Sequence, residues 1–212
     1  MTKTLMSCLA IAASFAAGAS QAATTSFTDE LLFGLAAGSL TTETFSGATL
    51  GTSLHGTVDF GPFSTTLNST VTGSGFNVIA NPGLNAVGMN GTNLQFGLLD
   101  GETLTITFDT AITAFGAIFA AVNNDNTQRS TFSGGGTTDW LPTTPGAFSS
   151  FFGIVSDTAF TSITITGLAP SEGFGIDDLR FASATPVPVP ASGLLLAGVA
   201  LAGGWMARRR KA

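Results

Sequence analysis

Side chains that carry chemistry are scarce in this sequence. Its 212 residues include one cysteine, one histidine and no tyrosine, and only 9% are charged, against about 25% in a typical soluble domain. A lone cysteine, Cys8, excludes an internal disulfide, and a lone histidine, His55, excludes a histidine cluster for zinc and leaves one base for any catalytic triad. We therefore expect a protein that is not an enzyme and that is stabilised by core packing.

Positive charge is nearly absent from the centre of the chain. All 13 acidic residues lie between residues 23 and 184, where the only cations are Arg129 and Arg180, so this segment carries 11 more negative than positive charges. Nucleic acids and anionic lipids are bound through Lys and Arg side chains. The composition therefore argues against nucleic acid or anionic lipid as a partner of this segment.

The N-terminus has the parts of a secretory signal. Lys3 supplies positive charge, residues 5–19 are mostly apolar, and small residues surround position 22. This pattern predicts a signal peptide over residues 1–22, cleaved between Ala22 and Ala23. The apolar stretch is shorter than the run of about 20 residues that a membrane-spanning helix needs.

The C-terminus shows a second change in composition. Residues 185–190 form a proline-rich linker, in which alternating prolines disfavour helix. Residues 191–207 carry no charge and are just long enough for a transmembrane helix. A basic cytoplasmic tail over residues 208–212 follows, with the cations Arg208, Arg209, Arg210 and Lys211. Such a block stays on the cytoplasmic side, so we expect the bulk of the chain outside the membrane.

The linker, apolar span and basic end together resemble a PEP-CTERM sorting tail. The residues that carry the resemblance are Val187, Pro188, Val189, Pro190 and Ala191. This sequence is similar to the variant of the tail whose signature is VPLPA. It differs from the Pro-Glu-Pro form at Val189, where that form has glutamate. It implies export by a Gram-negative bacterium, transient membrane anchoring and processing by an exosortase-like membrane enzyme. The product would lie at the cell surface or in the extracellular matrix, with a link to exopolysaccharide and biofilm. A plain C-terminal anchor behind a proline-rich linker is the alternative.

Residues 23–184 are expected to form one all-β domain. Apolar and polar residues alternate strictly in residues 103–108 and less regularly in residues 160–166, as in strands with one buried face. Further candidate strands are residues 114–122, 151–155 and 174–181. Many short strands divided by Gly, Pro, Asn and Asp turns are typical of a β-sandwich or jelly roll. A short helix or a capping loop is expected at residues 30–37.

Three of these runs resemble exported jelly-roll domains that are similar to galactose-binding-like and carbohydrate-binding modules. They are residues 114–119, 151–157 and 173–181. The resemblance implies a single jelly-roll-like β-sandwich and, as in its calcium-bearing members, a possible structural Ca²⁺. The candidate ligands are Glu43, Asp177 and Asp178. Calcium needs six to eight oxygen ligands, so the alternative is that these carboxylates face solvent from strand edges.

Trp140 is the candidate ligand-contact residue. A sugar ring stacks on an exposed flat aromatic side chain, and Trp140 follows a run of three glycines that predicts a loop. The alternative is that Trp140 plugs one end of the sandwich. We therefore expect a non-catalytic surface or matrix protein, with a carbohydrate-binding module that recognises exopolysaccharide as the alternative. A glycoside hydrolase is the third possibility, because its pair of carboxylates is defined by distance in space.

Overall fold

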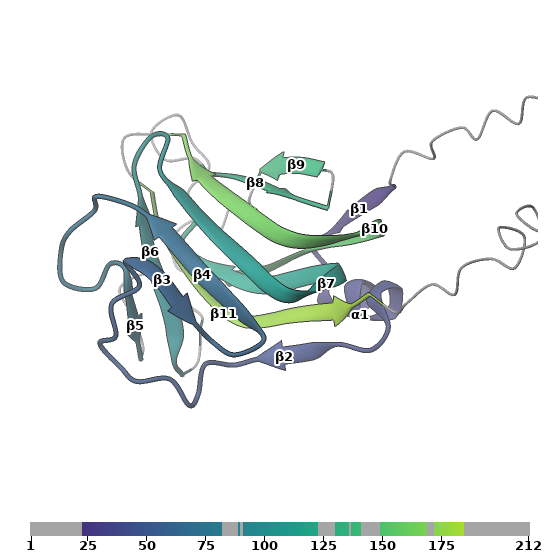
Figure 1. The fold of residues 1–212 in the computed structure, drawn as a ribbon, viewed down its shortest axis with the longest axis horizontal. Helices are drawn as coiled ribbons and strands as arrows, with labels where there is room; N and C mark the ends of the chain where they lie inside the picture. Colours follow the sequence, from purple (N-terminus) through teal and green to yellow (C-terminus); the bar gives the residue numbers. More distant parts are fainter. Residues whose placement is uncertain are drawn as a thin grey trace, which may run out of the picture.

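The fold is described by a computed structural model, which covers residues 23–81, 89, 91–122, 130–135, 137–140, 149–168 and 172–184 and gives the backbone alone at 130–134, 137–140 and 172. Eleven strands and one helix lie in these ranges (Figure 1). In chain order they are β1 (Thr24–Phe27), α1 (Glu30–Ala37), β2 (Thr41–Glu43), β3 (Gly56–Asp59), β4 (Phe63–Asn68), β5 (Val78–Ala80), β6 (Asn93–Leu98), β7 (Thr103–Ala120), β8 (Ser130–Gly134), β9 (Thr137–Trp140), β10 (Ser149–Gly167) and β11 (Glu172–Ser183).

Both targeting segments predicted from the sequence lie outside the described residues. These are the signal peptide with Ala22, the proline-rich motif at 187–191, the apolar span and the cations at 208–211. Ala23 is the first described residue and is exposed. Within the described ranges, no helix is long and apolar enough to cross a bilayer.

Two long strands, β7 and β10, run through both layers of the sandwich. The first half of β7, residues 103–108, pairs with β4 and with the second half of β10. Its second half, residues 112–120, pairs with β11 and with the first half of β10. β3, β8 and β9 extend the first layer, and β1, β5 and β6 extend the second. The expected all-β, jelly-roll-like sandwich is confirmed.

The strands predicted as separate pieces are continuous in the structure. Residues 103–108 and 114–120 belong to the single strand β7, and residues 151–155 and 160–166 belong to β10. The predicted strand at 114–122 ends at Ala120. The β7–β10 register shifts between Val155 and Ser162, and the two strands bend together there. Such irregularities increase local twist and bend, which lets one strand serve two layers.

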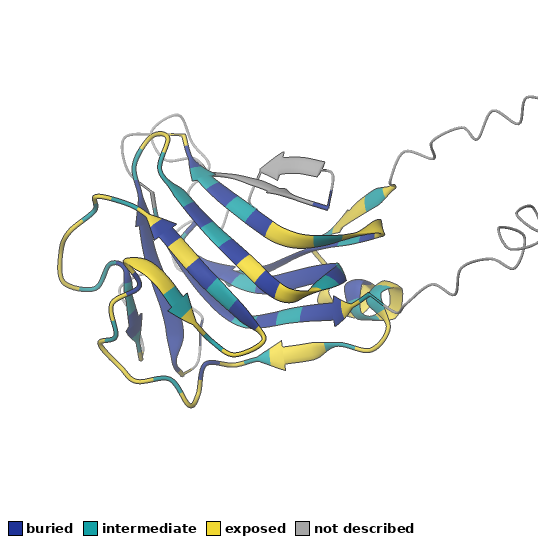
Figure 2. Ribbon diagram, viewed as in Figure 1, coloured by how far each residue is buried: buried dark blue, intermediate teal, exposed yellow. Residues whose placement is uncertain are grey.

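Burial follows this division along β7. Its first half alternates between buried and more exposed residues, whereas residues 114–117 are all buried (Figure 2). Phe115, Ala117 and Phe119 face the main core between the layers. Ala114 packs on the opposite face, in a smaller cluster with Phe33 of α1. The second half of β7 is therefore covered on both faces.

Helix α1 supplies that second cover. It is the helix expected at residues 30–37, and it begins where the Asp29 carboxylate accepts a hydrogen bond from the Leu32 N–H at 2.9 Å. It ends at Gly38, which has a φ of 77° and donates its N–H to the Gly34 carbonyl. Asp29 satisfies an otherwise free N–H of the first turn. The buried Phe33 ring tilts against the Phe151 ring, with 5.0 Å between ring centroids.

The two rings lie over a pair of glycines. Gly116 of β7 and Gly153 of β10 are directly opposite each other in the ladder. A Cβ on Gly116 would lie 2.5 Å from the Phe151 Cζ, and a Cβ on Gly153 would lie 2.9 Å from the Phe33 Cδ2. Glycine at these positions lets α1 approach the sheet.

Gly116→Ala is expected to destabilise the domain. The added methyl group must displace the Phe151 ring, which is already packed against Phe33, so the free energy of unfolding should fall by about 1–3 kcal/mol. Urea denaturation measures the change. The matched control is Gly47→Ala, because a Cβ there meets nothing within 4 Å, and its effect should stay within about 0.5 kcal/mol. Equal stability of the two variants would contradict this packing.

Candidate functional site

The two aspartates predicted on the last strand lie at a β-bulge. Asp177 is opposite Ile118 and Arg180 is opposite Gly116, so two residues of β11 face a single residue of β7 between these pairs. Asp178 has a φ of 48°, in the left-handed region that a bulge residue can adopt. The extra residue places Leu179 in the core and keeps Asp177 and Arg180 on the outer face.

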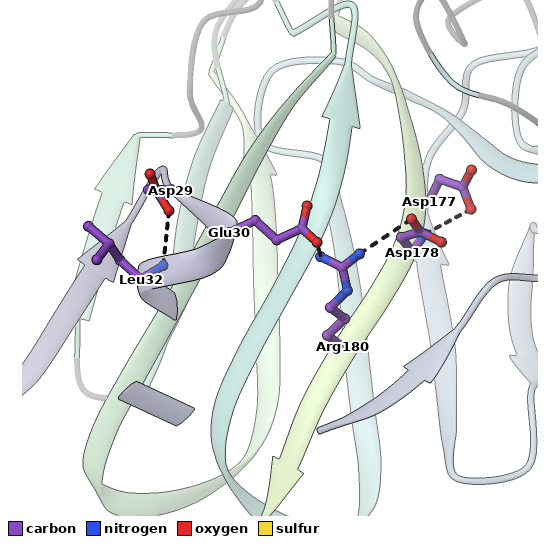
Figure 3. Close-up of polar contacts among 6 residues, drawn as sticks. All are labelled: Asp29, Glu30, Leu32, Asp177, Asp178 and Arg180. Carbon is purple, nitrogen blue, oxygen red and sulfur yellow. Dashed lines mark hydrogen bonds and ion pairs between the residues drawn. The ribbon is translucent and has the colours of Figure 1, made fainter. Parts of the chain in front are cut away.

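Asp177 is a buried carboxylate, with 6% of the residue exposed. Burial and the neighbouring Asp178 charge raise its pKa, a hydrogen bond from the Asp178 N–H and the Arg180 charge lower it, and the net result is a rise from 3.8 to about 6. The Asp178 N–H donates to Asp177 Oδ1 at 2.8 Å (Figure 3). Near neutral pH, this carboxylate is therefore ionised at a cost in stability.

Arg180 joins three elements around these acids. Its Nη1 forms an ion pair with Glu30 Oε1 of α1 at 2.8 Å, although the two groups are not aligned for a hydrogen bond. Its Nη2 lies 3.4 Å from Asp178 Oδ2 (Figure 3). The guanidinium carbon also lies 5.8 Å from the centroid of the Phe151 ring of β10. The Arg180 side chain is only 14% exposed, so this contact holds α1 against β11.

The structure does not bring Glu43 together with the two aspartates. Glu43 of β2 is opposite Leu179, and directly opposed residues of antiparallel strands share a face, so Glu43 lies on the side away from Asp177. Its Oε1 accepts a hydrogen bond from the Phe45 N–H at 2.7 Å. In the part of the chain that the structure describes, no three acidic, histidine or cysteine side chains gather as a metal site. Calcium remains a prediction that the structure does not test.

Glu43 instead borders an open hollow of about 430 Å³. A second carboxylate, that of Asp59, lies on its wall, together with the hydroxyl-bearing Thr49 and Thr52 and the ring of Phe60. Its complete lining is Glu43, Gly47, Ala48, Thr49, Thr52, Val58, Asp59, Phe60 and Ile79. The combination of carboxylates, hydroxyls and an aromatic ring can hold a polyhydroxylated ligand.

The sequence alone does not reveal this hollow, because its residues come from Phe60, which follows β3, from β2, β3 and β5, and from the segment between β2 and β3. Hydrogen bonds to the backbone of β5 hold that segment in place: the Gly51 N–H donates to the Ile79 carbonyl at 2.8 Å, and the Ile79 N–H donates to the Thr52 carbonyl at 3.0 Å. A short sequence motif cannot indicate such a pairing, because the paired residues are far apart in the chain.

Asn77 anchors the chain directly before β5. It is fully buried with a φ of 54°. Its side-chain Oδ1 accepts from the Gly97 N–H at 2.9 Å, its Nδ2 donates to the Val71 carbonyl at 3.0 Å, and its own carbonyl accepts from the Leu54 N–H. The lone histidine, His55, is exposed and lies 3.5 Å from the Asn77 amide. No hydroxyl–histidine–carboxylate arrangement is present among the described residues.

Trp140 lies in a strand, so the predicted loop is wrong. It ends β9, opposite Thr131 of β8, and its side chain is outside the described part of the structure. Gly135, which has a φ of 58°, lies at the turn between β8 and β9. The Thr24 and Ser156 hydroxyls both donate to the Gly135 carbonyl, which fixes the hairpin on the sandwich. Threonine and tryptophan favour strands once this turn brings β8 and β9 together.

Comparison with known families identifies one motif. Residues 186–211 match the PEP-CTERM protein-sorting motif, so the chain carries a sorting motif of this type directly after the described domain. No curated protein matches the chain in sequence.

Three solved structures illustrate the structural similarities. The catalytic unit of a GH87 α-1,3-glucanase from Streptomyces thermodiastaticus is 15% identical over 61% of this chain, with a TM-score of 0.34, and the match covers 28% of that structure. A carbohydrate-binding module of Cellvibrio mixtus lichenase 5A, in complex with cellotriose, is 18% identical over 57% of this chain and 88% of the module, with a TM-score of 0.29. A family 6 carbohydrate-binding module is 16% identical over 70% of this chain and 95% of its own, with a TM-score of 0.29. The chain thus spans less than a third of the glucanase structure, and these likenesses are slight.

Asp177→Asn is expected to stabilise the cation-free domain at neutral pH. The native pKa lies above the ordinary value, so the native state binds the proton more tightly and loses stability as pH rises from about 4 to above 6. The substitution should add about 1–3 kcal/mol at pH 7 in EDTA and almost nothing at pH 4. Thermal unfolding at the two pH values measures the difference.

The exposed Asp109→Asn variant is the control for a simple change of net charge. Lower stability of Asp177→Asn in EDTA at pH 7 would show that the charged carboxylate stabilises the fold. Adding calcium in the same experiment tests the predicted ion, because a ligand that binds only the native state raises the unfolding temperature. A rise that Asp177→Asn abolishes would favour a bound cation. If calcium does not raise the unfolding temperature of the parent protein, the predicted calcium site is wrong.

Proposed function

We propose that this chain is an exported, non-catalytic protein that is held in the membrane by its C-terminal tail and released to the cell surface or extracellular matrix by an exosortase-type enzyme. The observation that carries the proposal is the sorting motif at residues 186–211. It begins two residues after Ala184, where the described domain ends. The host would be a Gram-negative bacterium, and the sequence VPVPA points to the VPLPA variant of the tail.

The composition of the domain supports this destination. The mature chain would lack cysteine once the signal peptide with Cys8 is removed, so its folding would not depend on the redox state outside the cell. Its excess of acidic residues keeps copies of the domain apart by mutual repulsion. These properties fit a protein that has to remain folded and dispersed among polysaccharides.

The arrangement of polar groups supports a non-catalytic role. Both carboxylates at the hollow already accept a backbone hydrogen bond: Glu43 from the Phe45 N–H, and Asp59 Oδ1 from the Gly61 N–H at 2.8 Å. Each carboxylate is thus already engaged by the backbone of its own turn, whereas glycoside hydrolysis needs a carboxylic acid that is free to protonate the leaving-group oxygen. A surface or matrix role requires no such group.

Substitution in the sorting motif tests the proposal. In the native host, Pro188→Ala combined with Pro190→Ala should leave the chain unprocessed, so that it accumulates in the membrane fraction at its higher mass. Cell fractionation with mass determination of the C-terminus measures this. Thr185→Ala lies before the matched motif and should be processed normally. Normal processing of the double proline variant would contradict a sorting role for these residues.

Carbohydrate binding is the second candidate function, and the hollow at Glu43 and Asp59 favours it. Carboxylates can accept hydrogen bonds from sugar hydroxyls, and the Phe60 ring offers an apolar edge. The protein should therefore be retarded on affinity gels that contain an exopolysaccharide of its host. Asp59→Ala should weaken this retardation, and Trp140→Ala separately tests the contact expected from the sequence. Asp109→Ala is the control, and unretarded migration of the parent protein on every polysaccharide would rule out this function.

A further inference from the structure

One side of helix α1 is apolar and uncovered. Leu31, Leu32 and Leu35 are 72%, 55% and 74% exposed, while Phe33 alone among the apolar residues of the helix is fully buried. Soluble domains usually place polar side chains on the outer face of such a helix. These three leucines make α1 the largest group of exposed apolar side chains among the described residues.

The leucines adjoin a second hollow, of about 470 Å³. Leu31, Leu35 and Leu40 form its apolar part, and the Arg180–Glu30 ion pair closes one side. The helix is fixed in this position by its Asp29 cap and by Phe33 below it. Because the helix cannot rotate, the fold itself keeps the three leucines exposed.

This face lies where the described chain ends. Ala182 of β11 belongs to the same packed cluster as Phe33 and Ala37 of α1, and the final part of β11 lies beside α1 (Figure 1). Only the six residues 185–190 separate Ala184 from the apolar run that begins at residue 191. Fully extended, six residues span at most about 20 Å.

We infer that the exposed leucines of α1 rest on the lipid bilayer that holds the sorting tail. The inference depends on the proposed function, because the tail has to be in the membrane for the short linker to bring α1 to the bilayer. Three leucines bind lipid too weakly to retain a free domain, but a short tether supplies an effective concentration of about millimolar. Removal of the tail then releases both contacts at once.

The charges around α1 determine which lipids suit this contact. Asp29 and Glu30 are exposed at the start of the helix. The Arg180 guanidinium is already engaged by Glu30 and Asp178. Apolar insertion is therefore expected into a zwitterionic surface, and anionic lipid should oppose it at low ionic strength.

A fluorescent label on α1 tests the contact in the full chain. With Cys8→Ser as background, Leu35→Cys carries the label, and the chain is reconstituted in phosphatidylcholine liposomes with brominated acyl chains. The control label is at Ser74→Cys, an exposed position in the segment between β4 and β5, which Figure 1 shows at the far end of the sandwich from α1. Quenching by the brominated lipid should be severalfold stronger at position 35 than at position 74.

A second variant separates lipid contact from mere proximity. Adding Leu31→Gln and Leu32→Gln to the labelled chain should reduce quenching at position 35 towards that of the control, without a change in melting temperature, because both side chains are exposed. Replacing part of the phosphatidylcholine by phosphatidylglycerol should also reduce the quenching, and salt should restore it.

Three results would overturn the inference. Equal, weak quenching at both labels in a chain that sediments with the liposomes would refute the lipid contact and leave the tail anchor intact. A chain that does not sediment with the liposomes would refute the anchor and the contact together. Protection of position 35 from aqueous iodide without quenching by brominated lipid would mean that the tail or a second copy of the chain covers α1.

Discussion

Pairing between β7 and β10 is the constraint on which the other elements depend, because the two strands hydrogen-bond through both layers. Residues 103–107 of β7 meet residues 162–166 of β10 in one layer, and the remaining halves meet in the other. β4 and β11 attach to β7, β1 and β8 attach to β10, and the outer strands attach to these. The Gly116–Gly153 pair in the same ladder provides the flat surface on which Phe33 packs. A single pairing thus positions both the core and helix α1.

Arg180 connects this framework to the acidic surface. Arg180 is the only lysine or arginine side chain that the structure describes, and it contacts Glu30, Asp178 and the Phe151 ring. Its position on the outer face follows from the bulge at Asp178, since without the extra residue the arginine would point into the core. Directly before the bulge, the Asp177 carboxylate is buried on the same face. Local backbone geometry therefore sets the electrostatics of the strand that leads to the sorting tail.

The sequence predicts the features whose causes are local. The alternation of apolar and polar residues predicts a strand at residues 103–108, which lie in β7. Helix α1 has the predicted bounds of 30–37, because the residues that start and end it, Asp29 and Gly38, directly flank it in the sequence. Other features depend on pairing between distant segments. The continuity of β7 and β10, the strand at Trp140 and the hollow between Glu43 and Asp59 all arise from such pairing. The register of β11 with β2, which separates Glu43 from Asp177, depends on a one-residue bulge that composition does not reveal.

The β-sandwich domain is followed directly by a motif that sorts exported proteins. The domain ends at the strand that leads directly into the sorting motif, and its acidic surface suits an exposed location. The most direct test is the intact mass of the mature protein isolated from its native host, with the C-terminus mapped by peptide sequencing. A mature protein that begins at Ala23 and ends near Pro190, without the apolar span and the basic residues, is the expected result. A membrane-bound protein that retains Ala212 would contradict processing and would make the chain a simple anchored protein.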